Sequence, residues 1–291
     1  MKLLSKKIKY IITDIDDTIA KTYHDISGNM AGYIEKLLKK NVKILMISGQ
    51  GKDNIYQRVI QYIPSGLRNN IAIAHCNGTE LFEFDYHGRL IETPTISFYD
   101  ELAVDFGKAE NVIRTILEKM GICFEYHNLH SISNTLFYAV IENRKVQISI
   151  DFFNIPSDFC KWKEEFVNNL KVKLEYENID VDVKSGGVSA IDIVLPGINK
   201  GKIIEKILER KQFIHDLPEA YDEVEVWGDS FLDGSDFDMC KALPLDIKKI
   251  SFRKVQKSDI LSRNNIDIWD GEEELNAGLE EYLVKSLGEK V

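Results

Sequence analysis

Short apolar runs alternate with segments of helical apolar spacing in the first part of the chain. Residues 8–13 are almost continuously apolar, which is typical of a strand buried on both faces of a parallel sheet. Apolar side chains then recur at helical spacing in residues 30–38, and a second apolar run covers 42–47. This order predicts a β-α-β unit, which a helix at 55–62 and a strand at 71–74 continue.

The pattern changes character in the middle of the chain. Residues 80–92 have the pattern of a hairpin that turns near His87 and Gly88. Beyond it the βα alternation is lost, and the pattern suits an antiparallel sheet that carries helices on one face. The elements predicted in this segment are helices at 99–120 and 157–170 and strands at 122–126, 136–142, 172–176, 181–183 and 191–195.

The βα alternation returns near residue 196. A helix at 200–209 and a strand at 223–227 are followed by two short strands near Ile250 and Ile266 and by a final helix. We therefore predict an α/β protein with a Rossmann-like parallel-sheet core and one inserted α+β domain. The core would comprise residues 1–84 and 196–291, and the inserted domain residues 85–195.

Length and composition are compatible with this two-domain organisation. A chain of 291 residues is long enough to bury two cores without disulfides or structural metals. Its 44% hydrophobic and 29% charged residues are usual for globular proteins, which argues against a disordered or fibrous class. A net charge of -10 repels the phosphates of nucleic acids and anionic membrane surfaces. We therefore expect neither a nucleic acid nor a membrane as partner.

Cysteine spacing and the N-terminal sequence bear on the compartment. The four cysteines lie far apart and form no C-x-x-C pair, which argues against a zinc site or a disulfide framework. The first residues are charged and lack the apolar stretch of a signal peptide, and no long apolar run suggests a membrane span. We expect a cytoplasmic protein with reduced cysteines.

Polar motifs follow the strands that are predicted for the core. Residues 14–18 read Asp-Ile-Asp-Asp-Thr directly after the first strand, and Ser48-Gly49 follows the second. Lys200 begins a predicted helix, and residues 228–233 read Gly-Asp-Ser-Phe-Leu-Asp after a later strand. Ligand sites of open parallel sheets lie beyond the carboxyl ends of the strands, so these four motifs are expected to share one site.

In order, spacing and placement, these motifs resemble those of haloacid dehalogenase (HAD) phosphatases over essentially the whole chain. The family pattern is D-x-D-x-T, a strand-end Ser or Thr, a Lys, and G-D-x-x-x-D. Only about 30 residues separate Thr18 from Ser48, so a cap domain would have to lie between Ser48 and Lys200. That position, with the α+β character of the segment, resembles the C2B cap of Cof-type sugar phosphatases and phosphomannomutases.

The resemblance implies a role for each motif. Asp14 would be the nucleophile, and the Asp16 side chain would be the general acid and base. Clustered aspartates suit this chemistry, because Mg²⁺ held by carboxylates neutralises the phosphate dianion and aligns it for attack. The residues implied are Asp14 and Asp16 for catalysis; Ser48, Gly49 and Lys200 for phosphate binding; Asp14, Asp16 and Asp229 for Mg²⁺; and Thr18, Asn77, Ser230 and Asp233 in support.

Three positions depart from the family pattern. Asp17 stands where this branch usually has Gly, and Gln50 replaces an Arg that often follows the strand-end Ser or Thr. Leu232 replaces the Asn of the usual G-D-x-x-N-D. Asp236 is therefore an alternative to Asp233 as the second acid of the last motif, although the spacing favours Asp233.

The resemblance implies a magnesium-dependent phosphatase that acts on a small phosphorylated metabolite, with a sugar phosphate as the expected substrate. Two alternatives stay open. One is a sugar phosphomutase similar to phosphomannomutases, in which the phosphoryl group returns to the sugar. The other is a non-catalytic phosphate-binding protein, although binding alone would not require the acid and base carboxylate of Asp16.

Overall fold

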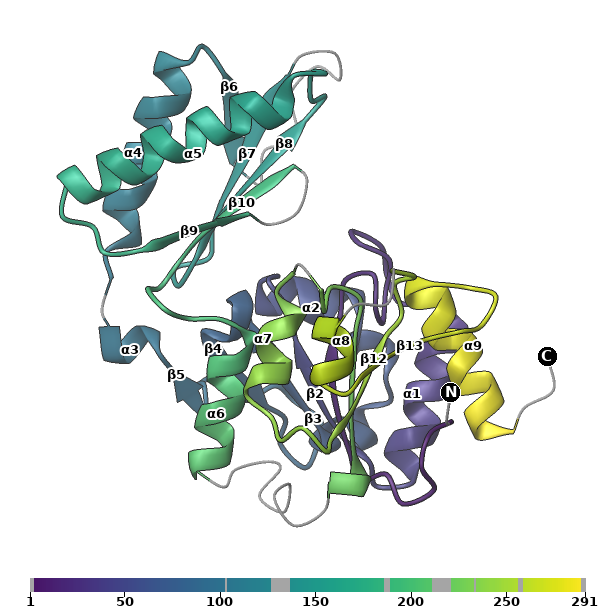
Figure 1. The fold of residues 1–291 in the computed structure, drawn as a ribbon. Coiled ribbons are helices and arrows are strands. Elements are labelled where there is room, and N and C mark those ends of the chain that lie inside the picture. Colours follow the sequence, from purple (N-terminus) through teal and green to yellow (C-terminus); the bar gives the residue numbers. More distant parts are fainter. Residues whose placement is uncertain are drawn as a thin grey trace. The chain divides into compact units, whose positions relative to one another are not determined.

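The computed structural model describes residues 3–102, 104–126, 137–185, 189–210, 221–232, 234–255 and 259–288. The chain divides into two compact units, one formed by residues 1–97 with 199–291 and the other by residues 98–198 (Figure 1). Residues 85–97, which the sequence assigns to the inserted domain, belong to the first unit, because a short strand there pairs with that unit's sheet. Among the described residues no helix combines the length and apolarity needed to cross a bilayer.

The first unit is built on an eight-stranded sheet with the order β13-β12-β11-β1-β2-β3-β4-β5. Six neighbouring strands are parallel: β1 (Tyr10–Asp14), β2 (Lys43–Ile47), β3 (Ile71–His75), β11 (Val224–Gly228), β12 (Lys248–Ser251) and β13 (Ile266–Ile268). β4 (Glu80–Glu83) pairs antiparallel with β3, and the edge strand β5 (Ile96–Ser97) pairs antiparallel with β4. This arrangement confirms the parallel-sheet α/β core.

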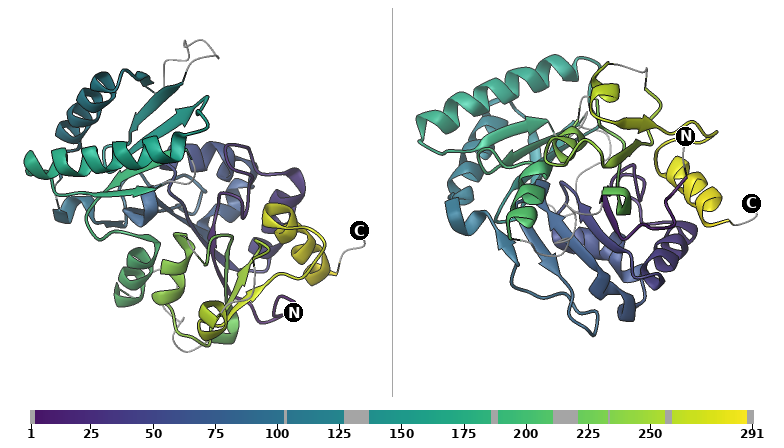
Figure 2. Two further views of the ribbon diagram at one scale, coloured as in Figure 1. Left: turned by 45° about the horizontal axis from the view of Figure 1, so that its top comes forward. Right: turned by 60° about the horizontal axis from the view of Figure 1, so that its bottom comes forward.

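Successive residues of a strand point to opposite faces, and both faces of the parallel strands are buried. On β1, Ile11 joins a core cluster that also contains side chains of α1 (Gly28–Lys39) and α9 (Leu275–Leu287), whereas the next residue, Ile12, is equally buried on the other face. Figures 1 and 2 show α1 and α9 side by side. Among the described residues, the further helices of this unit are α2 (Lys52–Arg58), α6 (Lys200–Arg210), α7 (Asp236–Lys241) and α8 (Asp259–Arg263), with 3-10 helices at Ile60–Tyr62, Ser65–Asn70, Cys76–Gly78 and Tyr221–Glu223.

The hairpin expected at residues 80–92 is present. Phe84 and Leu90 form an antiparallel bridge, and the Gly88 N–H donates to the Asp85 carbonyl at 2.9 Å. Gly88 has a φ of +73°, which glycine adopts without the steric cost that a side chain adds. The turn therefore lies where the His87-Gly88 pair predicts it.

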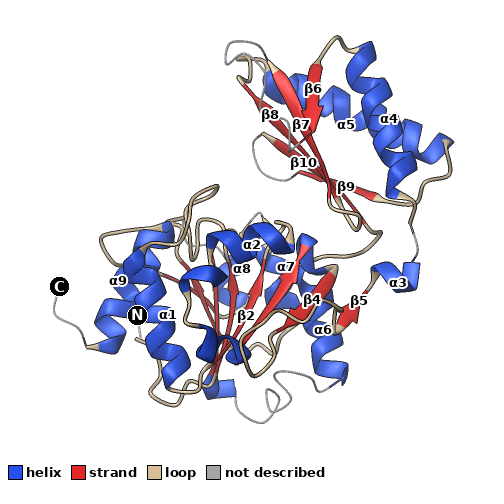
Figure 3. Cartoon of the chain, turned by 180° about the vertical axis from the view of Figure 1, so that it is seen from behind, coloured by secondary structure: helices blue, strands red, loops and turns tan. Residues whose placement is uncertain are grey.

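The second unit is a five-stranded sheet in the order β6-β7-β8-β10-β9, covered by α4 and α5 (Figure 3). β6 and β7 are parallel, and the other neighbouring pairs are antiparallel. Its elements are α3 (Tyr99–Leu102), α4 (Phe106–Lys119), β6 (Cys123–Tyr126), β7 (Tyr138–Asn143), β8 (Ile148–Phe153), α5 (Phe159–Tyr176), β9 (Asp182–Ser185) and β10 (Ala190–Val194). The α+β character of the inserted segment is confirmed.

One strand predicted in this unit is wrong, one strand that is present was not predicted, and the helix predicted at 99–120 is divided into α3 and α4. The strand predicted at 172–176 is the last part of α5, because Phe166, Leu170 and Leu174 are buried at helical spacing. Val172 and Tyr176, which would share a face with Leu174 in a strand, face water instead and are 68% and 75% exposed. Strand β8 was not predicted, although it is the central partner of both β7 and β10.

Candidate active site

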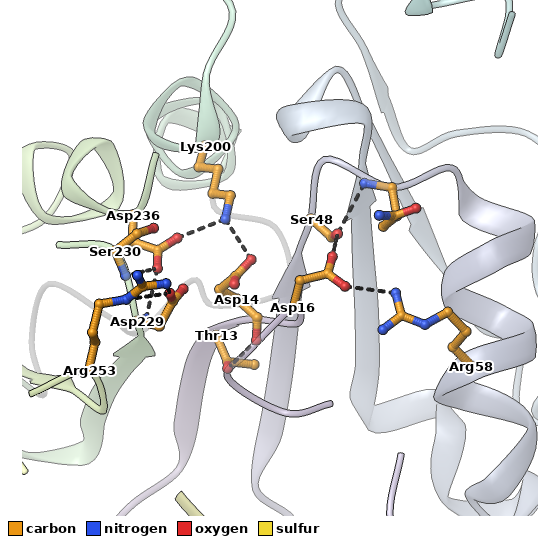
Figure 4. A network of polar contacts seen from close by, with 11 residues as sticks. Thr13, Asp14, Asp16, Ser48, Arg58, Lys200, Asp229, Ser230, Asp236 and Arg253 are labelled. Carbon is orange, nitrogen blue, oxygen red and sulfur yellow. Dashed lines mark hydrogen bonds and ion pairs between the residues drawn. The ribbon is translucent and has the colours of Figure 1, made fainter. Parts of the chain in front are cut away.

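Three neighbouring strands of the first unit bring the sequence motifs to one edge of the sheet. Asp14 is the last residue of β1, Ser48 follows β2, and Asp229 follows β11. Because β11, β1 and β2 are adjacent and parallel, their carboxyl ends lie side by side. Lys200, the first residue of α6, points into the same place (Figure 4).

Lys200 joins two buried carboxylates. Its Nζ donates to Asp14 Oδ1 at 2.6 Å and to Asp236 Oδ1 at 2.7 Å, and its side chain is only 5% exposed. Burial by itself would lower the pKa of Lys200, but the charges of Asp14 and Asp236 raise it above its ordinary value. Lys200 is therefore a permanent cation at the centre of the site.

Asp236, the alternative to Asp233 in the last motif, lies within this network. It begins α7, and its Oδ2 accepts the backbone N–H groups of Asp229 and Ser230, each at 3.0 Å. Burial opposes ionisation of Asp236, but Lys200 and these N–H donors hold its pKa below the usual range. Asp233 lies outside the described residues. The contacts of Asp236 support it as the second acid of the last motif.

Arg253 is a member of this network that the sequence motifs did not indicate. Its Nε donates to Asp229 Oδ2 at 3.1 Å, and its Nη2 contacts the same oxygen. Burial and the neighbouring charge of Asp236 nevertheless raise the pKa of Asp229 to about 6, against the opposing effect of Arg253. Arg253 follows β12, the strand next to β11, so the strand order of the sheet explains its position.

Asp14, Asp229 and Asp236 form a buried acidic cluster whose nearest carboxylate oxygens all lie within 4.8 Å of one another. Burial, first of all, and repulsion from the other carboxylates raise the pKa of Asp14 well above its ordinary value, despite Lys200. Carboxylate oxygens are the ligands that Mg²⁺ prefers in proteins, and a cation among them would offset the repulsion. The donor set therefore fits a divalent cation.

The Asp16 carboxylate lies on the other side of Asp14. Its Oδ2 accepts the Ser48 hydroxyl at 3.1 Å, and its Oδ1 accepts Nη1 of Arg58 at 2.8 Å. Ser48 Oγ in turn accepts the backbone N–H of Gln50 at 3.0 Å. Arg58, which lies at the end of α2, was not predicted as a site residue, because a lone arginine in a helix carries no local motif.

The loop that carries Asp14 and Asp16 includes one unusual backbone position. Asp17 has a φ of +56°, so it adopts the left-handed conformation that favours glycine and that Asp tolerates better than most residues. Its Oδ1 accepts the backbone N–H of Thr22 at 3.0 Å, which stabilises the turn. Thr18 is buried and donates its backbone N–H to the Ile15 carbonyl at 3.2 Å. The supporting role of Thr18 stays a prediction, because this contact is made by its backbone.

Asn77 and Gly49 lie beside each other on neighbouring loops. The Asn77 N–H donates to the Ser48 carbonyl at 2.9 Å, and a Cβ at Gly49 would lie 3.4 Å from Asn77 Oδ1. A larger residue at position 49 would therefore press on the Asn77 amide. The structure thus brings Ser48, Gly49 and Asn77 together near Asp16.

Comparison with solved structures finds related folds at low sequence identity. The C-terminal domain of trehalose-6-phosphate phosphatase from C. albicans has a TM-score of 0.67 and 15% identity, covering 98% of this chain and 93% of that chain. An IMP-bound, N-terminally truncated IMP-nucleotidase from Plasmodium falciparum has a TM-score of 0.55 and 17% identity, covering 98% and 69%. A trehalose-6-phosphate phosphatase related protein has a TM-score of 0.58 and 13% identity, covering 96% and 98%.

A comparison with curated protein sequences finds no match. Residues 11–217, however, match the family described as haloacid dehalogenase-like hydrolases. This range includes the motifs at Asp14, Ser48 and Lys200 and the whole of the second unit. The chain belongs to the haloacid dehalogenase-like hydrolase family.

Proposed function

We propose that this hydrolase is a magnesium-dependent phosphatase that cleaves a small phosphomonoester through an aspartyl-phosphate on Asp14. The observation that carries the proposal is the convergence of Asp14, Lys200, Asp229 and Asp236 from four separate segments. A buried lysine among three carboxylates is costly for stability alone, since apolar residues of similar size often serve a core at least as well. The cluster is better explained by a ligand that needs both charges, such as a phosphate with its metal ion.

In the proposed site, Asp14, Asp229 and the backbone carbonyl of Asp16 would hold Mg²⁺. When bound, the ion would supply positive charge that neutralises the phosphate dianion next to the attacking carboxylate. Asp236 would orient Lys200 and the backbone of Asp229, since it accepts a hydrogen bond from each. Lys200 would stabilise the oxygens of the phosphoryl group during transfer.

The proposed reaction has two steps. An oxygen of Asp14 forms a bond to phosphorus, while the bond to the leaving oxygen breaks and that oxygen takes a proton from Asp16. Asp16 then removes a proton from water, and the resulting oxygen attacks the phosphorus. This releases inorganic phosphate and regenerates Asp14. Ser48 lies within hydrogen-bond distance of Asp16, so the phosphoryl group would meet both residues together.

A sugar phosphate is the proposed substrate class. It is supported by the resemblance of the inserted unit to the caps of sugar phosphatases, and two of the similar structures carry trehalose-6-phosphate phosphatase in their names. The IMP-nucleotidase shows that the fold also occurs in a protein named for a nucleotide, so nucleoside monophosphates belong in the test panel.

The proposal is tested by phosphate release from sugar phosphates, nucleoside monophosphates and an aryl phosphate, each with Mg²⁺ or with EDTA. We expect release that requires Mg²⁺ and that falls by at least about 1,000-fold in Asp14→Asn, which removes the nucleophile. Asp238→Asn is the matched control, because this acid on α7 forms an ion pair with Lys241 and is not one of the three clustered carboxylates. No release from any substrate by folded wild-type protein would contradict the proposal. Isomerisation that requires a bisphosphate activator and releases no phosphate would indicate a phosphomutase instead.

A further inference from the structure

Arg58 is a buried hydrogen-bond donor to three different groups around the first motif. Its Nη1 donates to Asp16 Oδ1 at 2.8 Å, its Nε to the His24 carbonyl at 2.9 Å and its Nη2 to the Lys21 carbonyl at 2.9 Å. The residue is only 6% exposed. Since a buried guanidinium must be paired, its position and that of the Asp16 carboxylate are fixed together.

The backbone adds to this attachment. The Ile26 N–H donates to the Arg58 carbonyl at 2.8 Å, so the end of α2 is joined to residues 21–26 by backbone and side chain alike. Those residues directly follow the loop that carries Asp14, Asp16 and Thr18. The Arg58 guanidinium therefore holds both the segment that follows the loop and one oxygen of the Asp16 carboxylate, which the loop carries.

The two oxygens of Asp16 have different partners. Oδ1 accepts from Arg58, a planar and permanently charged donor, whereas Oδ2 accepts from the Ser48 hydroxyl at 3.1 Å. Figure 4 shows the carboxylate turned toward Ser48 and Arg58, while that of Asp14 is turned toward Lys200. A hydroxyl rotates and exchanges partners more readily than a buried guanidinium. Oδ2 is thus the oxygen that is easier to release toward a ligand.

Arg68 shows what a structural arginine does in the same region. Its Nε donates to the Ile63 carbonyl at 2.8 Å, its Nη1 to the Tyr56 hydroxyl at 2.9 Å and its Nη2 to the Gln61 carbonyl at 3.3 Å. This set resembles that of Arg58 in number and in its use of carbonyl groups. Arg68 is less buried than Arg58, and none of these three partners is a carboxylate, so Arg68 is the control for losing an arginine that bonds to neutral groups.

We propose that Arg58 is a positioning residue for proton transfer. It holds Oδ1 of Asp16 so that Oδ2 delivers the proton to the leaving oxygen. In that step the O–H bond at Oδ2 breaks, the phosphorus–oxygen bond of the substrate breaks, and the leaving oxygen keeps its electron pair and gains the proton. The inference rests on the proposed function, because Asp16 transfers a proton only if the chain cleaves a phosphomonoester.

The role is tested with two substrates of similar size and different need for a proton. The 4-nitrophenolate of 4-nitrophenyl phosphate leaves readily without one, whereas the phenolate of phenyl phosphate is far more basic and depends on protonation. The quantity to measure is kcat/KM with Mg²⁺, because it reports leaving-group departure and not the later hydrolysis of the aspartyl-phosphate. We expect Arg58→Gln to lower kcat/KM for phenyl phosphate at least about tenfold more than for 4-nitrophenyl phosphate.

Three further variants define the result. Asp16→Asn should show the same preference for 4-nitrophenyl phosphate over phenyl phosphate. Adding Arg58→Gln to Asp16→Asn should not increase this preference further. Arg58→Lys, which keeps a positive charge and a donor, should recover part of the loss with phenyl phosphate. Arg68→Gln should change both substrates by the same factor.

Equal losses with both substrates in folded Arg58→Gln and Arg58→Lys would overturn the positioning role, because a purely structural residue does not distinguish leaving groups. Failure of the wild type to release phosphate from either substrate is a different result. It would overturn the proposed function and, with it, this role for Arg58. Circular dichroism of each variant shows whether it is folded.

Discussion

At the scale of single residues, Asp236 has the most connected position in the site. One oxygen accepts from Lys200 and the other accepts two backbone N–H groups, so this carboxylate aligns α6 with the loop after β11. Its side chain is fully buried. Removing one partner of a buried pair leaves the other charge uncompensated, which costs far more than losing a surface ion pair.

We therefore predict that Asp236→Asn lowers the free energy of unfolding by about 3 kcal/mol. The control, Asp238→Asn, should change it by less than about 0.5 kcal/mol, because its ion pair with Lys241 lies at the surface, with the Lys241 side chain 59% and the Asp238 side chain 30% exposed. Urea unfolding of the two variants, alongside Asp233→Asn, measures the difference. A larger loss of both stability and phosphate release in Asp233→Asn than in Asp236→Asn would contradict the assignment.

His75 predicts a pH dependence of stability. Its Nε2 lies 2.9 Å from Glu80 Oε2 and its Nδ1 lies 3.0 Å from Cys76 Sγ. Burial alone would lower the pKa of His75, but Cys76 and Glu80 raise it to about 9, above its ordinary 6.5. A raised folded-state pKa stabilises the fold fully below pH 6.5, and the contribution is lost as the pH rises through about 9.

The stability difference between wild type and His75→Gln should accordingly be largest near pH 6 and shrink toward pH 9.5, by at most about 3 kcal/mol. Urea titrations of both proteins at several pH values give this difference. The contributions of the other titrating groups are the same in both proteins and cancel in the subtraction. A difference that is the same at every pH would mean that folding leaves the pKa of His75 unchanged and would contradict this prediction.

At the scale of elements, α5 shows how two periodicities compete in one sequence. Between residues 172 and 176, apolar Val172, Leu174 and Tyr176 alternate with charged residues as they would in a strand. The helix is favoured because Leu174 continues the buried series of Phe166 and Leu170, four residues apart. Packing against the sheet of the second unit thus decides between the two.

The two periodicities predict different effects of truncation. In the helix, Leu174→Ala removes a side chain that is 2% exposed and should cost about 3 kcal/mol of unfolding free energy. Val172→Ala truncates an exposed side chain and should cost less than about 0.5 kcal/mol. Urea unfolding followed by circular dichroism compares them, and similar costs for both would contradict the helical assignment.

At the scale of the whole molecule, the acidic cluster makes stability depend on a bound cation. Residues from both ends of the chain, Asp14 on one side and Asp229 with Asp236 on the other, meet only after folding. An ion that binds this cluster therefore binds the folded state selectively. Its binding free energy adds to the free energy of unfolding.

We predict that MgCl2 raises the melting temperature of the wild type relative to NaCl of equal ionic strength. At a concentration one hundred times the dissociation constant, the gain is about 2.7 kcal/mol. The shift should be absent from Asp14→Asn and Asp229→Asn and retained in Asp238→Asn. Differential scanning calorimetry makes the comparison, and an equal magnesium effect in all four proteins would place the ion elsewhere.

The sequence by itself determined the parallel-sheet α/β class, the insertion of an α+β unit and the position of Asp14, Ser48, Asp229 and Lys200 at element ends. These features are local, because buried strands and amphipathic helices have short apolar periods and the motifs directly adjoin them. Even Asp17, a departure from the family pattern, has the left-handed backbone that a Gly there would favour.

Only the tertiary structure decided which side chains complete these motifs. Arg58 meets Asp16 across 42 residues of sequence, and Asp236 meets Lys200 across 36. Such pairs depend on the order of strands in the sheet and on the packing of helices over it, for which a single sequence has no local signal. The contacts of Asp236 and the continuation of α5 have the same cause, because burial in the folded chain selects among candidates that look alike in sequence.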